Sequence, residues 1–199
     1  MEISTHFFNM HFTISIMLVC SKFRICHARD TITKDTPLYS NETIISAGNI
    51  FELGFFTGQV DDNRNGSFVG IWYYKLQPRT IVWVANRDQP QSLDSKQVVF
   101  IGEDNNLHFT DKFTRRNFTR SSNTTAKLLD TGNLVLIDGQ SGKIWWQSFK
   151  HPTDTFLPGM KMTAELELTS WIELSRPGTG IYKFKLDEDE KLYVIKKKR

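Results

Sequence analysis

The chain has 199 residues and a formal net charge of +3, and its two cysteines both lie near the N-terminus. This length suits one domain with a single core, or one domain followed by a fragment of a second, and leaves little room for two full-sized domains. A net charge this small does not indicate a nucleic-acid-binding protein.

Residues 1–28 are predicted to be a signal peptide. The apolar run at residues 12–20 is too short to span a bilayer but has the length of a signal-peptide core, and Ala28 provides a small residue for cleavage. Cleavage would remove both Cys20 and Cys26, so the mature fold would have no internal disulfide. The alternative is that this segment forms a buried N-terminal strand.

Four N-x-S/T sequons predict a glycosylated surface in a secreted protein. They begin at Asn41, Asn65, Asn117 and Asn123, and none has proline in the middle position.

Short apolar runs separated by Gly, Asn, Asp and Pro predict an all-β domain. No window shows a sustained helical period. The predicted strands cover residues 50–56, 68–74, 80–85, 98–101, 107–110, 134–137 and 144–147.

A weak internal repeat indicates three similar sheets around one core. In each copy a turn ending in Asn leads into an apolar strand, at residues 48–51, 105–108 and 132–135. Four tryptophans lie in apolar strands, and we expect them to pack in the core rather than to form an exposed platform for sugars. They are Trp72, Trp83, Trp145 and Trp146.

The segment after residue 151 contains Pro and Gly in turn-forming positions and is predicted to leave the main domain. Beyond it, Leu166 and Leu168, and then Tyr182, Phe184 and Leu186, alternate with charged residues. Each stretch is expected to be half buried, with one face on the core. The basic end at residues 196–199 is interpreted as a solvated tail.

Five motifs in order resemble the plant bulb-type (mannose-binding-type) lectin domain of S-locus glycoproteins and G-type lectin S-receptor-like kinases. They are FELGFF at 51–56, GIWY at 70–73, IVWVANRD at 81–88, LLDTGNLVL at 128–136 and WQSFKHPTDTFLPGMK at 146–161. The resemblance implies a β-prism of three antiparallel sheets with pseudo-threefold symmetry, over residues 29–160. Residues 161–199 resemble the start of an S-locus glycoprotein region, so we expect a partial β extension and a form truncated before the cysteine-rich, membrane and kinase parts.

Bulb-type lectins carry a Q-x-D-x-N-x-V-x-Y strand that binds mannose, and its period of two places the five side chains on one face. The second repeat has Gly102, Asp104, Asn106, His108 and Thr110 at these positions, and the third keeps only Asn133 and Val135. Candidate sugar-binding residues are therefore Asp104, Asn106 and Asn133. The alternative is structural: a hydrogen-bonded turn at Asp104 and Asn106, and a left-handed turn residue at Asn133.

The sequence contains no nucleophile motif, metal-ligand cluster or glycine-rich phosphate loop, so we expect neither an enzyme nor a bound metal or cofactor. The predicted function is extracellular recognition of a mannose-type glycan or glycoprotein, in self-recognition or defence signalling. A related receptor chain or self-association is a further predicted partner, and no membrane span is expected in this chain. The alternative is that sugar binding is lost and the chain recognises a protein or acts as a soluble decoy.

Overall fold

The computed structural model describes residues 29–110, 123–187 and 191–197. The predicted signal peptide, both cysteines and the sequon at Asn117 lie outside the described residues.

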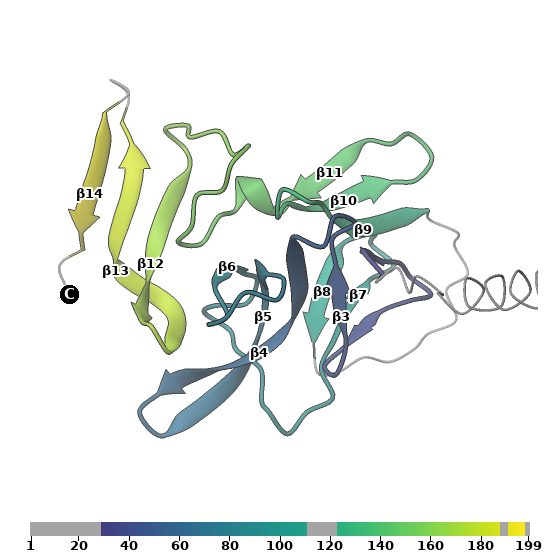
Figure 1. Ribbon diagram of the computed structural model, residues 1–199, viewed down its shortest axis with the longest axis horizontal. Helices are drawn as coiled ribbons and strands as arrows, with labels where there is room; N and C mark the ends of the chain where they lie inside the picture. Colours follow the sequence, from purple (N-terminus) through teal and green to yellow (C-terminus); the bar gives the residue numbers. More distant parts are fainter. Residues whose placement is uncertain (1–28, 111–122, 188–190, 198–199) are drawn as a thin grey trace, which may run out of the picture.

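The described residues form four antiparallel sheets and no α-helix (Figure 1). Three of the sheets follow the sequence repeats. The repeat-one sheet contains β3 (Thr43–Ile45), β4 (Phe51–Asp61), β5 (Arg64–Tyr73) and β6 (Ile81–Val84). The repeat-two sheet contains β2 (Leu38–Tyr39), β7 (Val98–Ile101) and β8 (Leu107–Thr110), and the repeat-three sheet contains β1 (Thr31–Ile32), β9 (Thr124–Leu128), β10 (Leu134–Asp138) and β11 (Ile144–Gln147).

The C-terminal sheet contains β12 (Glu167–Glu173), β13 (Arg176–Leu186) and β14 (Leu192–Lys196), at the left of Figure 1. A single 3₁₀ turn, η1 (Ser148–Lys150), follows β11. The predicted all-β fold with three repeat sheets and a C-terminal β extension is confirmed. The domain boundary at residue 160 stays a prediction.

One apolar core joins the three repeat sheets. Each sheet contributes fully buried side chains at alternate strand positions, because successive side chains of a strand point to opposite faces. Leu53 and Ile71 come from the repeat-one sheet, Val99 from the repeat-two sheet, and Ala126 and Leu128 from the repeat-three sheet. The core therefore depends on all three repeats at once.

The tryptophans divide between two clusters and the surface. Trp83 is buried in the main core, where its ring meets Trp146 edge-on at 6.0 Å and its Nε1 donates to the carbonyl of His151 at 2.8 Å. Trp72 is buried in a second cluster with Phe56 and Phe68. The prediction was wrong for Trp145, which is 47% exposed. Successive side chains of a strand point to opposite faces, so Trp146 packs on the core while its neighbour Trp145 points to solvent.

The three repeat turns share one backbone feature, which supports the internal repeat. Each contains one residue with positive φ: Asn49 (57°), Asn105 (61°) and Gly132 (83°). In each, the amide of this residue donates to the carbonyl three positions earlier, at 2.8 to 3.0 Å. The first turn is one residue longer than the other two, because the Ser46 amide donates to the carbonyl five positions later, whereas in the second and third turns the corresponding bond spans four positions. The structural alternative for Asn133 was wrong in one respect, because the left-handed residue of the third turn is Gly132.

Arg87 joins the repeat-one sheet to the C-terminal sheet. Its guanidinium donates to four backbone carbonyls, those of Thr169 (3.0 Å), Ser170 (2.8 Å), Pro177 (3.2 Å) and Gly178 (3.3 Å). Burial lowers the pKa of Arg87 from its usual value, and the nearby carboxylates of Asp88 and Asp154 oppose that shift. An arginine guanidinium stays charged in proteins, so these hydrogen bonds are of the strong, charge-assisted kind.

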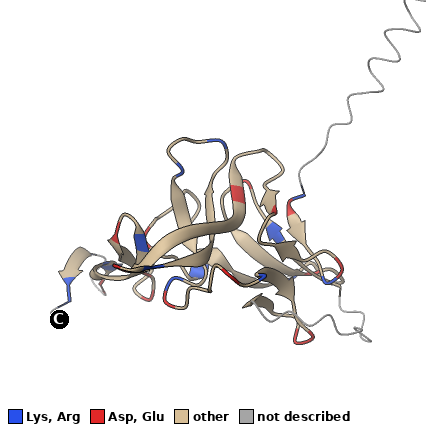
Figure 2. Cartoon of the chain, turned by 90° about the horizontal axis from the view of Figure 1, so that it is seen from below, with Lys and Arg blue, Asp and Glu red and all other residues tan. Residues whose placement is uncertain are grey.

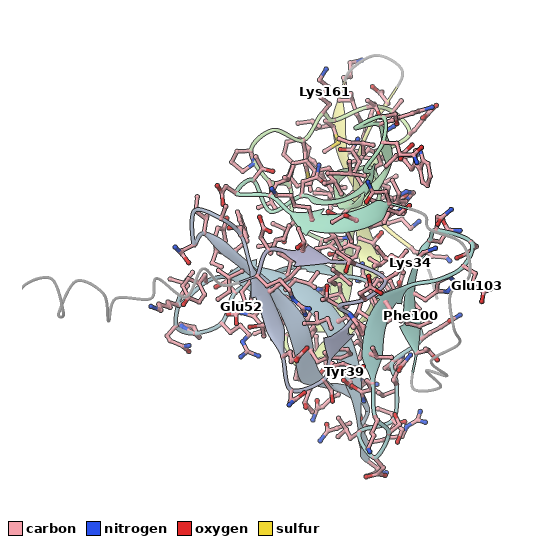
Figure 3. All side chains as sticks on the ribbon, turned by 90° about the vertical axis from the view of Figure 1, so that its right-hand side faces the viewer. Lys34, Tyr39, Glu52, Phe100, Glu103 and Lys161 are labelled. Atoms are coloured by element: carbon pink, nitrogen blue, oxygen red, sulfur yellow. The ribbon has the colours of Figure 1, made fainter. Side chains whose placement is uncertain are left out.

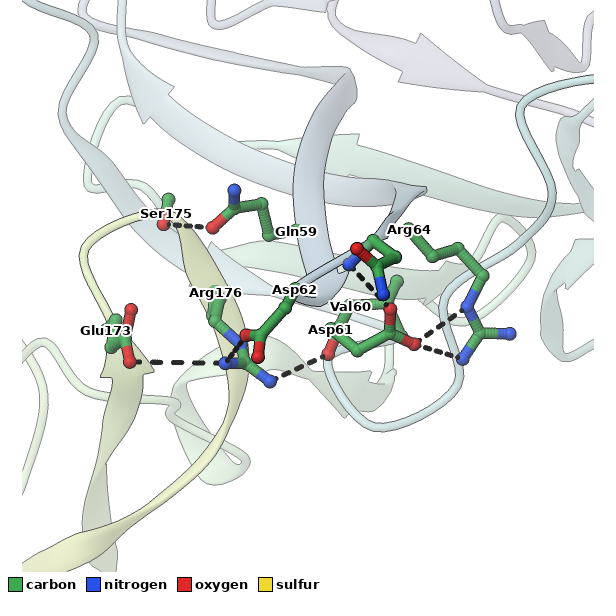
Figure 4. A network of polar contacts seen from close by, with 9 residues as sticks. Gln59, Val60, Asp61, Asp62, Arg64, Glu173, Ser175 and Arg176 are labelled. Carbon is green, nitrogen blue, oxygen red and sulfur yellow. Dashed lines mark hydrogen bonds and ion pairs between the residues drawn. The ribbon is translucent and has the colours of Figure 1, made fainter.

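Further polar contacts hold the C-terminal sheet against the lectin sheets, and Figure 4 shows those made by the β4–β5 hairpin. Asp88 accepts from the amide and hydroxyl of Thr179 at 2.9 and 2.7 Å. Arg176 pairs with Asp62 at 3.1 Å, and Ser175 donates to Gln59 at 2.7 Å. The motif pair Arg87-Asp88 thus reaches residues about 90 positions later in the chain.

The far side of the C-terminal sheet is more open than expected. Leu166 and Leu168 are buried as predicted, but Tyr182 and every residue of β14 are exposed. The expectation that Tyr182 faces the core was therefore wrong, because β13 and β14 extend beyond the lectin sheets. Within the described ranges, no helix is long and apolar enough to cross a membrane.

Candidate functional site

The turn between β7 and β8 presents the Asp104 cluster, which consists of Asp104, Asn106 and His108. Asp104 Oδ1 accepts from the Asn106 amide at 3.1 Å, and Oδ2 accepts from Asn106 Nδ2 at 2.9 Å. His108 Nε2 lies 2.9 Å from Oδ1 and 3.1 Å from Oδ2. The structure therefore brings together two of the three predicted sugar-binding residues, and both are exposed.

His108 fills the space above Gly102, the position where the family pattern has glutamine. A Cβ built at Gly102 would lie 2.7 Å from both Asp104 Oδ1 and His108 Nε2, so a side chain at this position would require the ends of those two side chains to shift. The imidazole also stacks on Phe100 at 5.4 Å. The sequence pattern placed His108 on the strand but did not reveal that its ring meets Asp104. The sequence signal that could have indicated this contact is the spacing of four residues between Asp104 and His108, on either side of the turn.

The Asp104 carboxylate is strongly stabilised in its charged form. Hydrogen bonds, first from His108 and then from Asn106, lower the pKa of Asp104 from 3.8 to about 2, against a small opposing effect of burial. The group therefore stays an anionic acceptor at any physiological pH.

A cavity of about 290 Å³ lies beside Asn106, between the repeat-two and repeat-three sheets. Apolar side chains line the rest of it: Leu107, Phe109, Leu136 and Trp146. A sugar ring has polar hydroxyls and an apolar C–H face, and this pairing of an amide with aromatic and aliphatic walls matches both.

The third predicted residue, Asn133, lies in a different setting. It is 7% exposed; its Nδ2 donates to Gln147 Oε1 at 2.9 Å, and its Oδ1 accepts from the Phe149 amide and the Ser148 hydroxyl, both at 3.2 Å. The hydrogen bonds of its side-chain amide are therefore made to the end of β11 and to the residues that follow it.

Three of the predicted glycosylation sites, Asn41, Asn65 and Asn123, are exposed. Figure 2 shows basic and acidic residues interspersed over strands and loops, with no large face of one sign. Among the described residues, no group of three or more His, Cys, Asp or Glu side chains is placed to hold a metal ion.

Comparison with known proteins identifies the module. Residues 80–174 match the D-mannose binding lectin family. A G-type lectin S-receptor-like serine/threonine-protein kinase of Arabidopsis thaliana is 44% identical over 168 residues, which cover 79% of this chain and 19% of that protein. A second such kinase of Arabidopsis thaliana is 38% identical over 216 residues, covering 90% of this chain and 25% of that protein.

A glycoprotein relative gives the same result. An S-locus-specific glycoprotein of Brassica oleracea is 36% identical over 188 residues, which cover 86% of this chain and 42% of that protein. The chain thus spans less than half the length of each of these relatives. It carries a bulb-type lectin domain and belongs with the lectin modules of G-type lectin S-receptor-like kinases and S-locus glycoproteins.

Proposed function

We propose that the chain is an extracellular, non-catalytic recognition module that binds a mannose-type glycan through Asp104 and Asn106. The observation that supports this most is the Asp104 cluster, an exposed polar network beside an apolar cavity. Membership of the D-mannose binding lectin family supports the same ligand class.

The cluster offers sugar hydroxyls both kinds of hydrogen-bonding group. Asp104 remains a charged acceptor, while Asn106 has an amide whose Oδ1 accepts no hydrogen bond within the described ranges. Hydrogen bonds to a charged acceptor are the stronger kind, so Asp104 is expected to contribute most. His108 acts as a positioning residue, because it holds the carboxylate from the side where the family pattern has glutamine.

Sugar contact by Asn133 stays a prediction. The buried amide would act on a ligand through Gln147, whose side chain it orients.

Calorimetric titration with mannose and a mannotriose, supported by a glycan array, tests the proposal. Binding by the wild type should fall about tenfold or more in Asp104→Ala, since removal of a charged hydrogen-bond partner costs about 1.5 to 3 kcal/mol. Asp94→Ala is the matched control, because Asp94 is exposed on the loop leading to the same sheet. Absence of wild-type binding, or equal loss in both variants, would contradict the proposal.

Recognition of a protein is the second candidate function. It is supported by the departures from the family pattern at Gly102, His108 and Thr110, and by the internal use of the Asn133 amide. On this proposal the partner is a related receptor chain or a second copy of this chain. Sedimentation at high concentration that gave only monomer would contradict self-association.

A further inference from the structure

A second concave site lies at the end of the molecule away from the Asp104 cluster. It is a groove of about 700 Å³, which we call the lysine groove, between residues 147–151 on one wall and residues 159–166 on the other. Figure 3 shows Lys161 at one end of the molecule, well separated from Glu103 beside the Asp104 turn. The volume is within the range of small-molecule sites.

Both walls of the lysine groove are held by the fold. Asn133, which is buried, accepts from the Phe149 amide and donates to Gln147, so it fixes the first wall. On the second wall, the Met160 amide donates to the carbonyl of the buried Leu157 at 3.1 Å. A ligand would therefore enter a preformed groove and would lose little affinity to ordering the protein.

The lining combines apolar and flat aromatic surfaces with polar groups. Phe149 and Met160 are partly buried against the main core and line the groove. The ring of His151 stacks on Trp146 at 5.6 Å with an interplanar angle of 7°, which fixes its plane. Such surfaces suit the C–H faces of sugar rings.

The charged groups of the groove favour an anion. Lys150 and Lys161 stand on opposite walls, both are exposed, and neither has an ion-pair partner within the described part of the chain. One carboxylate, that of Glu165, also lines the groove. Two ammonium groups against one carboxylate leave a positive balance, and each ammonium offers three donors.

We propose that the lysine groove binds an acidic oligosaccharide, with Lys150 and Lys161 contacting sugar carboxylates while Phe149 and Met160 pack against the ring. Glu165 accepts from sugar hydroxyls at the rim. An acidic peptide fits less well, because extended peptides add along open strand edges. Of the lining residues only Gln147, the last residue of β11, lies in a strand, and the others lie in a 3₁₀ turn and irregular segments. This second site goes beyond the proposed function and does not depend on the Asp104 cluster.

Calorimetric titration of the full chain with a galacturonate trimer tests the proposal, and the methyl-esterified trimer is the neutral reference. The acid should bind at least about tenfold more tightly than the ester, because charge-assisted hydrogen bonds are roughly twice as strong as neutral ones. Lys150→Gln combined with Lys161→Gln should remove this difference, while Lys143→Gln, an exposed lysine outside the groove, should retain it. Asp104→Ala should also retain it, which separates this proposal from that of mannose binding.

Several outcomes would overturn the proposal. These are equal affinity for the acid and the ester, no binding of the acid, or the same loss in Lys143→Gln as in the double variant. If a glutamate peptide bound as tightly as the galacturonate trimer, the ligand of the groove would be an acidic peptide and the proposal of a saccharide ligand would be wrong. Circular dichroism and thermal melting of each variant show that any loss reflects the site, since all three lysines are exposed.

Discussion

The three lectin sheets and the C-terminal sheet are all antiparallel, but different interactions hold them in place. The lectin sheets share one apolar core to which every repeat contributes fully buried side chains. The C-terminal sheet buries Leu168, and Leu166 just before it, but leaves all of β14 exposed. Its position depends on hydrogen bonds to its backbone, chiefly those from Arg87, together with one apolar contact in which Trp171 stacks on Phe56 at 6.4 Å.

This difference separates two ways of attaching a sheet to a domain. The free energy gained by burying apolar side chains is proportional to the buried area and does not depend on direction. A shared core therefore stabilises all three repeats together. Hydrogen bonds from one guanidinium have direction and reach only a few carbonyls, so they fix the orientation of the C-terminal sheet. We therefore expect the two regions to respond differently to substitution.

The largest effect is expected for Leu53→Ala, near the start of β4. Leu53 is fully buried in the main core, so the free energy of unfolding should fall by about 2 to 5 kcal/mol. Urea denaturation measures this, with Leu174→Ala as the control because Leu174 is 99% exposed. Similar losses in the two variants would mean that the three repeats do not share a core.

The next effect is expected for Arg87→Leu, which leaves four carbonyls of the C-terminal sheet without their donor. Loss of these bonds should destabilise the docked sheet by roughly 1 to 3 kcal/mol, because the replaced group is charged and partly buried. Hydrogen exchange should become faster in β12 and β13 and remain slow in β4. Arg64→Leu, which removes an exposed local ion pair, is the control, and equal acceleration in β4 would contradict separate attachment.

Within the lectin sheets, acid titration of Asp104 tests whether an exposed hydrogen bond affects only its own turn. The folded pKa of Asp104, about 2, is below its usual 3.8, so its contribution to stability is present above pH 3.8 and is lost as pH falls toward 2. In His108→Leu the pKa of Asp104 should move toward 3.8, as followed by NMR of the carboxyl carbon. His151→Leu should leave it unchanged, and an equal shift in both variants would contradict a contact specific to His108.

The smallest effect is expected for Val194→Thr in β14. Val194 is 72% exposed, and surface substitutions away from special features change stability by about 0.5 kcal/mol or less. Thermal unfolding at two protein concentrations measures this. A larger loss that depends on concentration would show that β14 is covered by a second copy, and would weaken the contrast between the two regions.

Predicted and observed strands agree best where β-branched and aromatic residues run together. Strands β7, β8 and β11 have the bounds predicted from the sequence, and the run at 50–56 is the start of the longer β4. The short strands β1, β2 and β3 were missed, because two or three residues carry no recognisable period. Strand β9 was also missed, since polar Thr125 and Lys127 occupy its half-buried positions and Thr124 is one of its buried residues.

At the candidate sites, too, the sequence pattern identified residues on one strand face but not the contacts between distant segments. The family pattern selected Asp104 and Asn106, because a period of two identifies residues on one face of a strand. It did not reveal the contact of His108 with Asp104, which depends on the space left by Gly102. Nor did it reveal that Arg87 and Asp88 hold the C-terminal sheet, or that Asn133 holds one wall of the lysine groove, since these contacts join segments far apart in the chain.

By itself, the sequence determined the all-β class, the three repeats with their turns and the family, because these depend on local backbone preferences and on the order of motifs. Only the tertiary structure decided that Trp146 is inward and Trp145 outward, that Asn133 is buried, and that four carbonyls converge on Arg87. Burial and long-range hydrogen bonds depend on which sheets lie together, and the spacing of residues along the chain does not specify that.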